Sequence, residues 1–242
     1  MATQCVAPCE LPYPSSWRIS SGHSTKSLAD RLVLDRSGGG ILDLRVQLLV
    51  REAVPDRRFD LLRLVVAACT SEGIRRDTGI VSWLHWPDLV TIDDRVVART
   101  TLALTAPPQH DRRARIAMGI AVRCFPNRLP AFAPPLPSTS IEGVLGVKID
   151  LALLRDKILH AVDWYHAEWE RGMDEKLAER IRPTIPWIGQ EVEATLPGLP
   201  PARGLAKGLD AFGSLLLDVG DGGGATTLTL RPGLVEVVRV VD

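Results

Sequence analysis

The stretch from Trp83 to Leu104 constrains the fold of this chain more than any other. Two runs rich in β-branched residues, 90–92 and 95–104, flank the acidic pair Asp93-Asp94, a pattern typical of two antiparallel strands joined by a tight turn. Successive residues of a strand point to opposite faces of its sheet. The second run therefore predicts one face with Val96, Ala98, Thr100, Leu102 and Leu104, and another with Val97, Arg99, Thr101 and Ala103. We expect a hairpin inside a layered sheet.

The composition indicates a folded protein without a nucleic-acid or membrane partner. Of 242 residues, 45% are apolar and 24% are charged, and this length allows one large domain with a small second one. The net charge is zero, so no excess positive field draws the chain to nucleic acid or to an anionic membrane. No apolar run approaches the ~20 residues that span a bilayer. We expect a cytoplasmic protein.

Periodic patterns predict the elements around the hairpin. Ile41 to Val50 alternates as a strand, and Ala114 to Cys124 has the composition of a buried strand. Four helices are predicted from capping residues and periodicity: one over 27–34, one over 57–72 that Asp56 caps and Gly73 ends, a short one with a capping box at Thr139 and Glu142, and one from Asp150 through Gly172.

The C-terminal part changes character. Two prolines interrupt 180–186, which favours a domain boundary there. Beyond it, Gly-, Pro- and Asp-containing turns separate five short strand-like runs, near 190–196, 203–209, 214–219, 226–231 and 235–241. This pattern is typical of a small β-barrel. We expect domains over 1–184 and 185–242.

Metal chemistry is not expected. Cys5 and Cys9 are close together, but no second Cys/His pair follows with zinc spacing. His160 and His166 also lack the spacing of helical ligands.

Two motifs carry a resemblance to a known family. The hairpin begins with His85-Trp86-Pro87-Asp88-Leu89 and continues with Arg95-Val96-Val97-Ala98-Arg99-Thr100. This order resembles the hairpin of biotin-protein ligases, Lys-Trp-Pro-Asn-Asp-Leu, a turn, then Lys-(Leu/Val)-Ala-Gly-Ile-Leu. The segment from Gly204 to Leu217 is similar to their SH3-like C-terminal domain. The resemblance implies an α+β fold: a mixed β-sheet with packed helices, followed by a small SH3-like barrel.

The resemblance also implies a ligand pocket. Ser24 and Thr25 match a family Ser-Thr-Asn that contacts the biotin head group, with Lys26 in place of the asparagine, and Gly119 matches a glycine of the family strand Gly-Ile-Gly-Ile-Asn-Val. The implied pocket residues are Ser24, Thr25, Lys26, Trp86, Pro87, Asp88, Val96, Ala98, Arg99 and Gly119.

Departures from the family pattern bear on activity. The family lysine falls on Val96, its ligand-facing glycine falls on Arg99, and its arginine- and glycine-rich loop has no counterpart between Lys26 and Ile41. These groups would stabilise charge during adenylate formation. We therefore expect a degenerate homologue that retains no catalytic residue, needs no cofactor, and binds a small acyl ligand or a protein partner without ligase activity. We also expect Arg99 to narrow the pocket beside Asp88 or Asp43.

The alternative is an active biotin or lipoate-type ligase. Such an enzyme would use ATP and magnesium to join biotin to a lysine of a carrier domain, with Lys26 as a substitute for the hairpin lysine. By the same resemblance, the partners to consider are biotin or another small acyl ligand, a carrier-domain protein, and a second copy of the chain in a homodimer.

Overall fold

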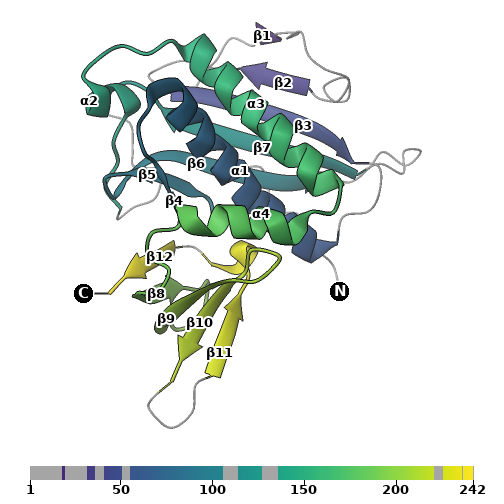
Figure 1. Cartoon of the computed structure of the whole chain (residues 1–242), viewed down its shortest axis with the longest axis vertical. Coiled ribbons are helices and arrows are strands. Elements are labelled where there is room, and N and C mark those ends of the chain that lie inside the picture. Colours follow the sequence, from purple (N-terminus) through teal and green to yellow (C-terminus); the bar gives the residue numbers. More distant parts are fainter. Residues whose placement is uncertain are drawn as a thin grey trace.

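The computed structural model describes residues 18–19, 32–35, 41–50, 55–105, 114–126, 136–220, 226–235 and 237–241. They form two sheets, a large one and a small one that lies at one end of the molecule (Figure 1). The large sheet has the strand order β1-β2-β3-β7-β6-β5-β4. Its strands are β1 Arg18–Ile19, β2 Leu32–Asp35, β3 Ile41–Val50, β4 Trp83–His85, β5 Leu89–Ile92, β6 Arg95–Thr105 and β7 Ala114–Arg123.

The predicted hairpin is confirmed as β5 and β6. Asp93 and Asp94 adopt φ angles of 48° and 57°, the left-handed pair that a two-residue hairpin turn requires. A register irregularity beside Val90 interrupts the alternation that the sequence predicts, so that Val96, Val97 and Ala98 are all buried. The predicted alternation of faces is therefore wrong before Ala98, while burial alternates as expected from there to Ala103.

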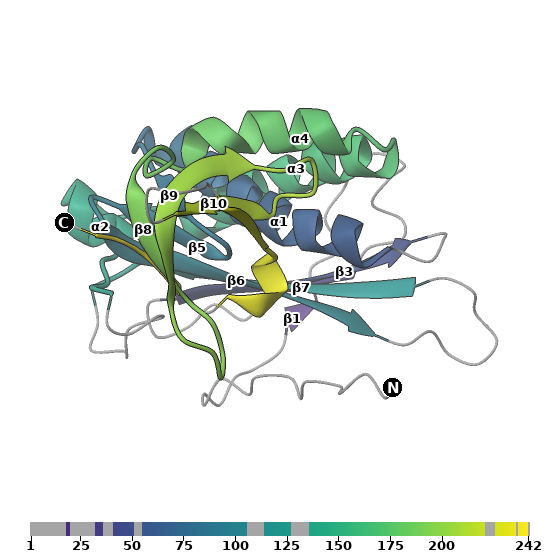
Figure 2. The same ribbon diagram turned by 90° about the horizontal axis from the view of Figure 1, so that it is seen from below.

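The long helices cover one face of the large sheet (Figure 2). They are α1 Asp56–Thr78, α3 Leu151–Glu170 and α4 Asp174–Ile181, and the short α2 Ile141–Leu145 lies near one end of the sheet. The core on this face includes Leu42, Leu44 and Val46 of β3, Ile116, Met118 and Ile120 of β7, and Leu61, Leu64 and Val65 of α1.

Two helix boundaries differ from prediction at the ends of α1. The helix does not stop at Gly73 but continues to Thr78, and Gly79 ends it with φ 74°. Gly73 is needed for packing instead, because a Cβ at this position would lie 2.7 Å from Cα of Ile158 on α3. At the other end, the flanking residue is Pro55, and Asp56 already lies inside the helix.

Three further predictions are settled by the described residues. The helix predicted over 27–34 is wrong at its end, because residues 32–34 belong to β2. Ser140, one residue after the predicted Thr139, caps α2 by accepting a hydrogen bond from the Gly143 amide. The cap at Asp150 is confirmed, since its side chain accepts hydrogen bonds from two amides of the first turn of α3.

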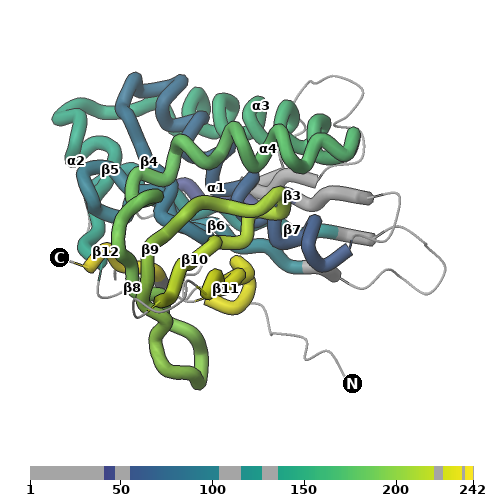
Figure 3. Tube along the Cα trace, turned by 60° about the horizontal axis from the view of Figure 1, so that its bottom comes forward, coloured from purple at the N-terminus to yellow at the C-terminus, as the bar shows by residue number. Residues whose placement is uncertain are grey.

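The small sheet contains the five predicted strands. Its order is β11-β10-β9-β8-β12, all antiparallel, with β8 Glu191–Thr195, β9 Ala202–Leu209, β10 Leu215–Val219, β11 Thr226–Leu230 and β12 Val237–Val240. Figure 3 shows β12 and β8 on one side of this sheet and β11 on the other. Closure into an SH3-like barrel and a boundary between 184 and 185 stay predictions, whereas the α+β fold class is confirmed.

The two sheets pack on each other through the start of the hairpin. The Trp86 indole donates a hydrogen bond to the Gly213 carbonyl at 3.0 Å, and Nε2 of His85 lies 2.7 Å from the Val238 carbonyl oxygen. Asp60 of α1, which is 4% exposed, binds Nε of Arg231 at 2.6 Å. Buried apolar residues of both sheets form one continuous core cluster.

Candidate functional site

The face of the large sheet opposite the long helices carries the candidate site. Strands β3, β7 and β6 lie side by side there, and their register aligns residues in rows across the face. One row contains Asp43, Ala121 and Arg99, and the next contains Arg45, Gly119 and Thr101. Small residues on β7 thus form a floor between longer polar side chains on its two neighbours.

Gly119 lies at the centre of this floor. A Cβ at this position would collide with Oγ1 of Thr101, so the threonine side chain lies over the glycine backbone. A glycine here lets the neighbouring hydroxyl approach the middle strand. Arg45 and Arg99 flank the floor from β3 and β6, and their side chains are 40% and 47% exposed.

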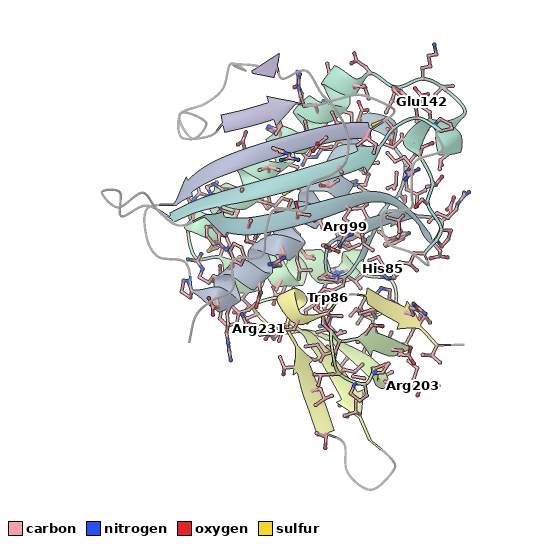
Figure 4. The ribbon with its side chains drawn as sticks, turned by 180° about the vertical axis from the view of Figure 1, so that it is seen from behind. His85, Trp86, Arg99, Glu142, Arg203 and Arg231 are labelled. Carbon is pink, nitrogen blue, oxygen red and sulfur yellow. The ribbon has the colours of Figure 1, made fainter. Side chains whose placement is uncertain are left out.

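Arg99 forms an ion pair with Asp88 at the start of the hairpin. Its Nε lies 3.7 Å from Oδ2 of Asp88, and Figure 4 shows Arg99 on this face of the sheet. Two acidic partners were expected for Arg99, and Asp88 is the one in this ion pair. Oδ2 of the other, Asp43, lies 4.0 Å from Nε of Arg45. Arg99 is half exposed, so its guanidinium borders the open face instead of being sealed beneath it.

The position of Asp88 is set by its own backbone. Its carbonyl oxygen accepts hydrogen bonds from the amide of Thr100 at 2.8 Å and from the Thr100 hydroxyl at 3.1 Å. Burial raises the pKa of the Asp88 carboxyl above its ordinary value of 3.8, and the charges of Arg99 and Arg63 oppose that shift. The carboxylate is therefore held in a poorly hydrated place by two cationic neighbours.

Val96, which the resemblance aligns with the family lysine, is fully buried. Its amide donates a hydrogen bond to the Pro137 carbonyl at 2.8 Å, and its carbonyl accepts one from the Thr139 amide at 2.9 Å. These bonds form a parallel bridge to Ser138 and cover the strand at this point. Position 96 therefore carries an apolar side chain, with its backbone bonded to the segment 137–139, and provides no cationic group.

The other predicted pocket residues are dispersed. Trp86 is fully buried and directed at the small sheet, as Figure 4 also shows, and Ala98 is part of the core cluster. Pro87 follows a cis peptide bond after Trp86. Ser24, Thr25 and Lys26 lie outside the described residues. The structure therefore brings together Asp88, Arg99 and Gly119, and membership of the other seven in a pocket stays a prediction.

Sequence reasoning did not assign Arg45 and Thr101 to the site. Alternation along Ile41 to Val50 places Arg45 on the polar face of that strand. Arg45 and Thr101 come together because both are paired with Gly119. This pairing follows from the strand order β3-β7-β6, which the sequence does not reveal.

No metal centre or reactive thiol is evident among the described residues. They contain no group of three or more His, Cys, Asp or Glu side chains that could hold a metal ion. Cys69 and Cys124 are buried, and burial raises the pKa of the Cys124 thiol to about 12. Cys5 and Cys9 lie outside the described residues. Within the same part of the chain, none of the helices is long and apolar enough to cross a membrane.

Comparison with known proteins gives the family context. The family model "Biotin protein ligase C terminal domain" matches residues 187–237. The bifunctional ligase/repressor BirA of Bacillus subtilis (strain 168) is 26% identical over 178 residues, which are 73% of this chain and 54% of BirA. The chain is thus similar to biotin protein ligases. It spans about half the length of this curated relative.

Solved structures show that this ligase-like protein shares the ligase fold. A mutant biotin protein ligase from Aquifex aeolicus in complex with biotin has a TM-score of 0.68 and 18% identity, covering 86% of this chain and 80% of the ligase. The ligase from the same organism in complex with biotin and ATP has a TM-score of 0.64 and 18% identity, covering 82% of this chain and 79% of the ligase. A biotin protein ligase-like protein of unknown function from a Silicibacter species has a TM-score of 0.63 and 14% identity, covering 81% of this chain and 80% of that protein.

Proposed function

We propose that this protein is a degenerate ligase homologue that binds a small acyl ligand through its free carboxylate, or binds a protein partner, without ligase activity. The observation that carries the proposal is Val96, which is fully buried and paired with the 137–139 segment where a ligase has its lysine. An ammonium at this place would have to enter a desolvated position, which is costly without an anionic partner. In this proposal the protein acts in the cytoplasm and needs no resident cofactor.

The open face supports a carboxylate as the group that is bound. Arg45 on β3 and Arg99 on β6 lie on either side of β7 in adjacent rows of the sheet, and Thr101 Oγ1 lies against Gly119. A guanidinium matches a carboxylate with two parallel hydrogen bonds, and each charge-assisted bond is stronger than a neutral one. An acyl chain would then lie along the small residues of β7, which leave room that larger side chains would fill.

Calorimetric titration tests this proposal. We expect octanoate or lipoate to bind the wild-type protein and the corresponding primary amide to bind at least about tenfold more weakly, since the amide lacks the charge that the arginines recognise. Arg99→Gln should reduce the difference between acid and amide, since only Arg45 then remains to recognise the charge. Arg203→Gln, which removes an arginine of similar exposure on β9, should leave this difference between acid and amide unchanged. Equal binding of acid and amide, or binding of neither, would contradict the proposal.

The second candidate is an active biotin or lipoate-type ligase, supported by the fold shared with a ligase that binds biotin and ATP. This candidate requires ATP, magnesium and biotin, and a carrier-domain lysine as acceptor. Its cationic group would be Lys26, the lysine nearest to a matched ligand motif. Lys26→Ala distinguishes the candidates if nucleotide-dependent acyl transfer is found, because loss of a catalytic ammonium should lower the rate about 100-fold or more at unchanged stability.

A further inference from the structure

An acid of the chain itself already faces Arg99, one of the two arginines of the proposed carboxylate site. Nε of Arg99 lies 3.7 Å from Oδ2 of Asp88. A charge-assisted hydrogen bond between such groups is about 2.7–2.9 Å long, so this contact through Nε is an open ionic one. A ligand carboxylate can instead form two parallel hydrogen bonds with a guanidinium. Asp88 and the ligand would therefore compete for the same cation.

The two members of this ion pair differ in their freedom to move. The carbonyl oxygen of Asp88 accepts hydrogen bonds from the amide and the hydroxyl of Thr100, which fixes the backbone of Asp88 against β6. The Asp88 side chain is 22% exposed, whereas the longer side chain of Arg99 is 47% exposed on the open face (Figure 4). Arg99 is therefore the member that can turn towards a ligand while the Asp88 carboxylate stays in place.

The charges around Asp88 link this movement to a proton. In the described part of the chain, Arg99 from β6 and Arg63 from α1 act on the Asp88 carboxyl. Burial raises its pKa, and Arg99 is the first of the two charges that oppose the shift. When Arg99 turns away, only Arg63 continues to oppose it, so the pKa of Asp88 rises further. Binding of a ligand to Arg99 is thus coupled to proton uptake by Asp88.

We propose that Asp88 is an internal competitor of the ligand: in the empty site it holds Arg99, and a ligand carboxylate binds by taking Arg99 from it. This inference rests on the proposed carboxylate site and adds its regulation. Because the pKa of Asp88 is higher in the complex than in the empty protein, the affinity for a carboxylate is lowest at neutral pH. It rises as the pH falls through the higher of these two pKa values.

Calorimetric titration of the full chain with octanoate at neutral pH tests the proposal. Asp88→Asn keeps the shape of the side chain and removes its charge, so it should bind octanoate at least about fivefold more tightly than the wild type. The matched control is Asp218→Asn. The Asp218 side chain is 16% exposed and pairs with Lys207 at 2.7 Å on the small sheet. We expect this control to bind octanoate as the wild type does.

A second measurement uses the wild type and does not depend on the folding of a variant. We expect its affinity for octanoate to rise at least about twofold from about pH 7.5 to about pH 5.5, as Asp88 takes up a proton. Octanoate stays mostly ionised in this range, and any proton that it takes up itself weakens its binding, so a rise must come from the protein. In Asp88→Asn most of this rise should be lost.

The outcomes separate this inference from the proposed function. An Asp88→Asn chain that binds octanoate no more tightly than the wild type overturns the role of Asp88 and leaves the carboxylate site in place. So does a wild type whose affinity for octanoate does not rise on acidification. If neither the wild type nor Asp88→Asn binds octanoate at either pH, the proposed function itself is wrong, and the inference falls with it.

Discussion

The Trp86 indole donates a hydrogen bond to the carbonyl oxygen of Gly213, a residue 127 positions later in the chain. This bond joins the hairpin of the large sheet to the turn before β10 in the small one. Gly213 lies there with φ 79°, and a Cβ on it would collide with Leu64 of α1. Helix, hairpin and small sheet thus meet at a single tightly packed point.

We predict that Trp86→Phe destabilises the whole chain. The change leaves the buried Gly213 carbonyl without its donor and opens space beside it, so the free energy of unfolding should fall by about 2–4 kcal/mol. Urea denaturation followed by circular dichroism measures this. The control Trp83→Phe changes a tryptophan that is 38% exposed on β4 and should cost less than about 1 kcal/mol. Equal effects of the two changes would contradict the packing described here.

Stability should fall on mild acidification because of His85. Burial lowers the pKa of His85 below its ordinary value of 6.5, although the Val238 carbonyl and Asp94 oppose the shift. Below pH 6.5 His85 binds a proton in the unfolded chain but stays neutral in the folded chain. The free energy of unfolding therefore has its full value above pH 6.5 and decreases as the pH falls towards the lowered pKa of His85 in the folded chain.

Urea denaturation at about pH 7.5 and about pH 5.5 checks this effect. His85→Gln keeps a side-chain donor for Val238 but cannot titrate, so it should lose a smaller part of its stability between the two pH values. His160→Gln, at an exposed position on α3, should behave as the wild type. The expectation fails if His85→Gln retains the full wild-type dependence.

Gly73→Ala should destabilise the protein although alanine favours helix formation. The new Cβ would lie 2.7 Å from Cα and 2.9 Å from the backbone nitrogen of Ile158, so α1 and α3 must separate. Overpacking of this kind costs about 1–3 kcal/mol, more than the roughly 1 kcal/mol that alanine gains over glycine in a helix. A rise in the melting temperature would show that the helices pack less closely than described.

Arg99→Gly should make room for biotin beside Asp88 on this face of the sheet. The wild-type side chain pairs with Asp88 at a position that the resemblance aligns with a family glycine, so isothermal titration should detect no tight biotin binding to the wild type. The glycine variant should bind biotin measurably, whereas Arg203→Gly should not. Tight binding of biotin by the wild type would refute the view that Arg99 narrows the site.

Local patterns in the sequence predicted most of the elements. Alternation identified β3, the composition of a buried strand identified β7, the acidic pair at 93–94 identified the hairpin turn, and Asp150 identified the start of α3. Errors arose where tertiary contacts decide. Gly73 has the signature of a helix end, yet it is a contact point between two helices that the sequence does not place together.

The site was only partly predictable for a similar reason. The resemblance identified Asp88 and Arg99 as neighbours, because both lie in one hairpin motif. It did not identify Arg45 and Thr101, which become neighbours of Gly119 through the register of three strands. Nor could it foresee that Trp86 points at a residue of the second sheet.

Biotin-dependent adenylate formation tests the central claim most directly. Purified protein is incubated with biotin, ATP and magnesium, and released pyrophosphate and biotinyl-adenylate are quantified beside the Aquifex aeolicus ligase as a positive control. Loss of one preorganised charge-stabilising group typically lowers a rate about 10²–10³-fold. By the resemblance, the buried Val96 aligns with the family lysine. The account predicts pyrophosphate release at the level of a reaction without protein. Robust release that requires both biotin and this chain would contradict it.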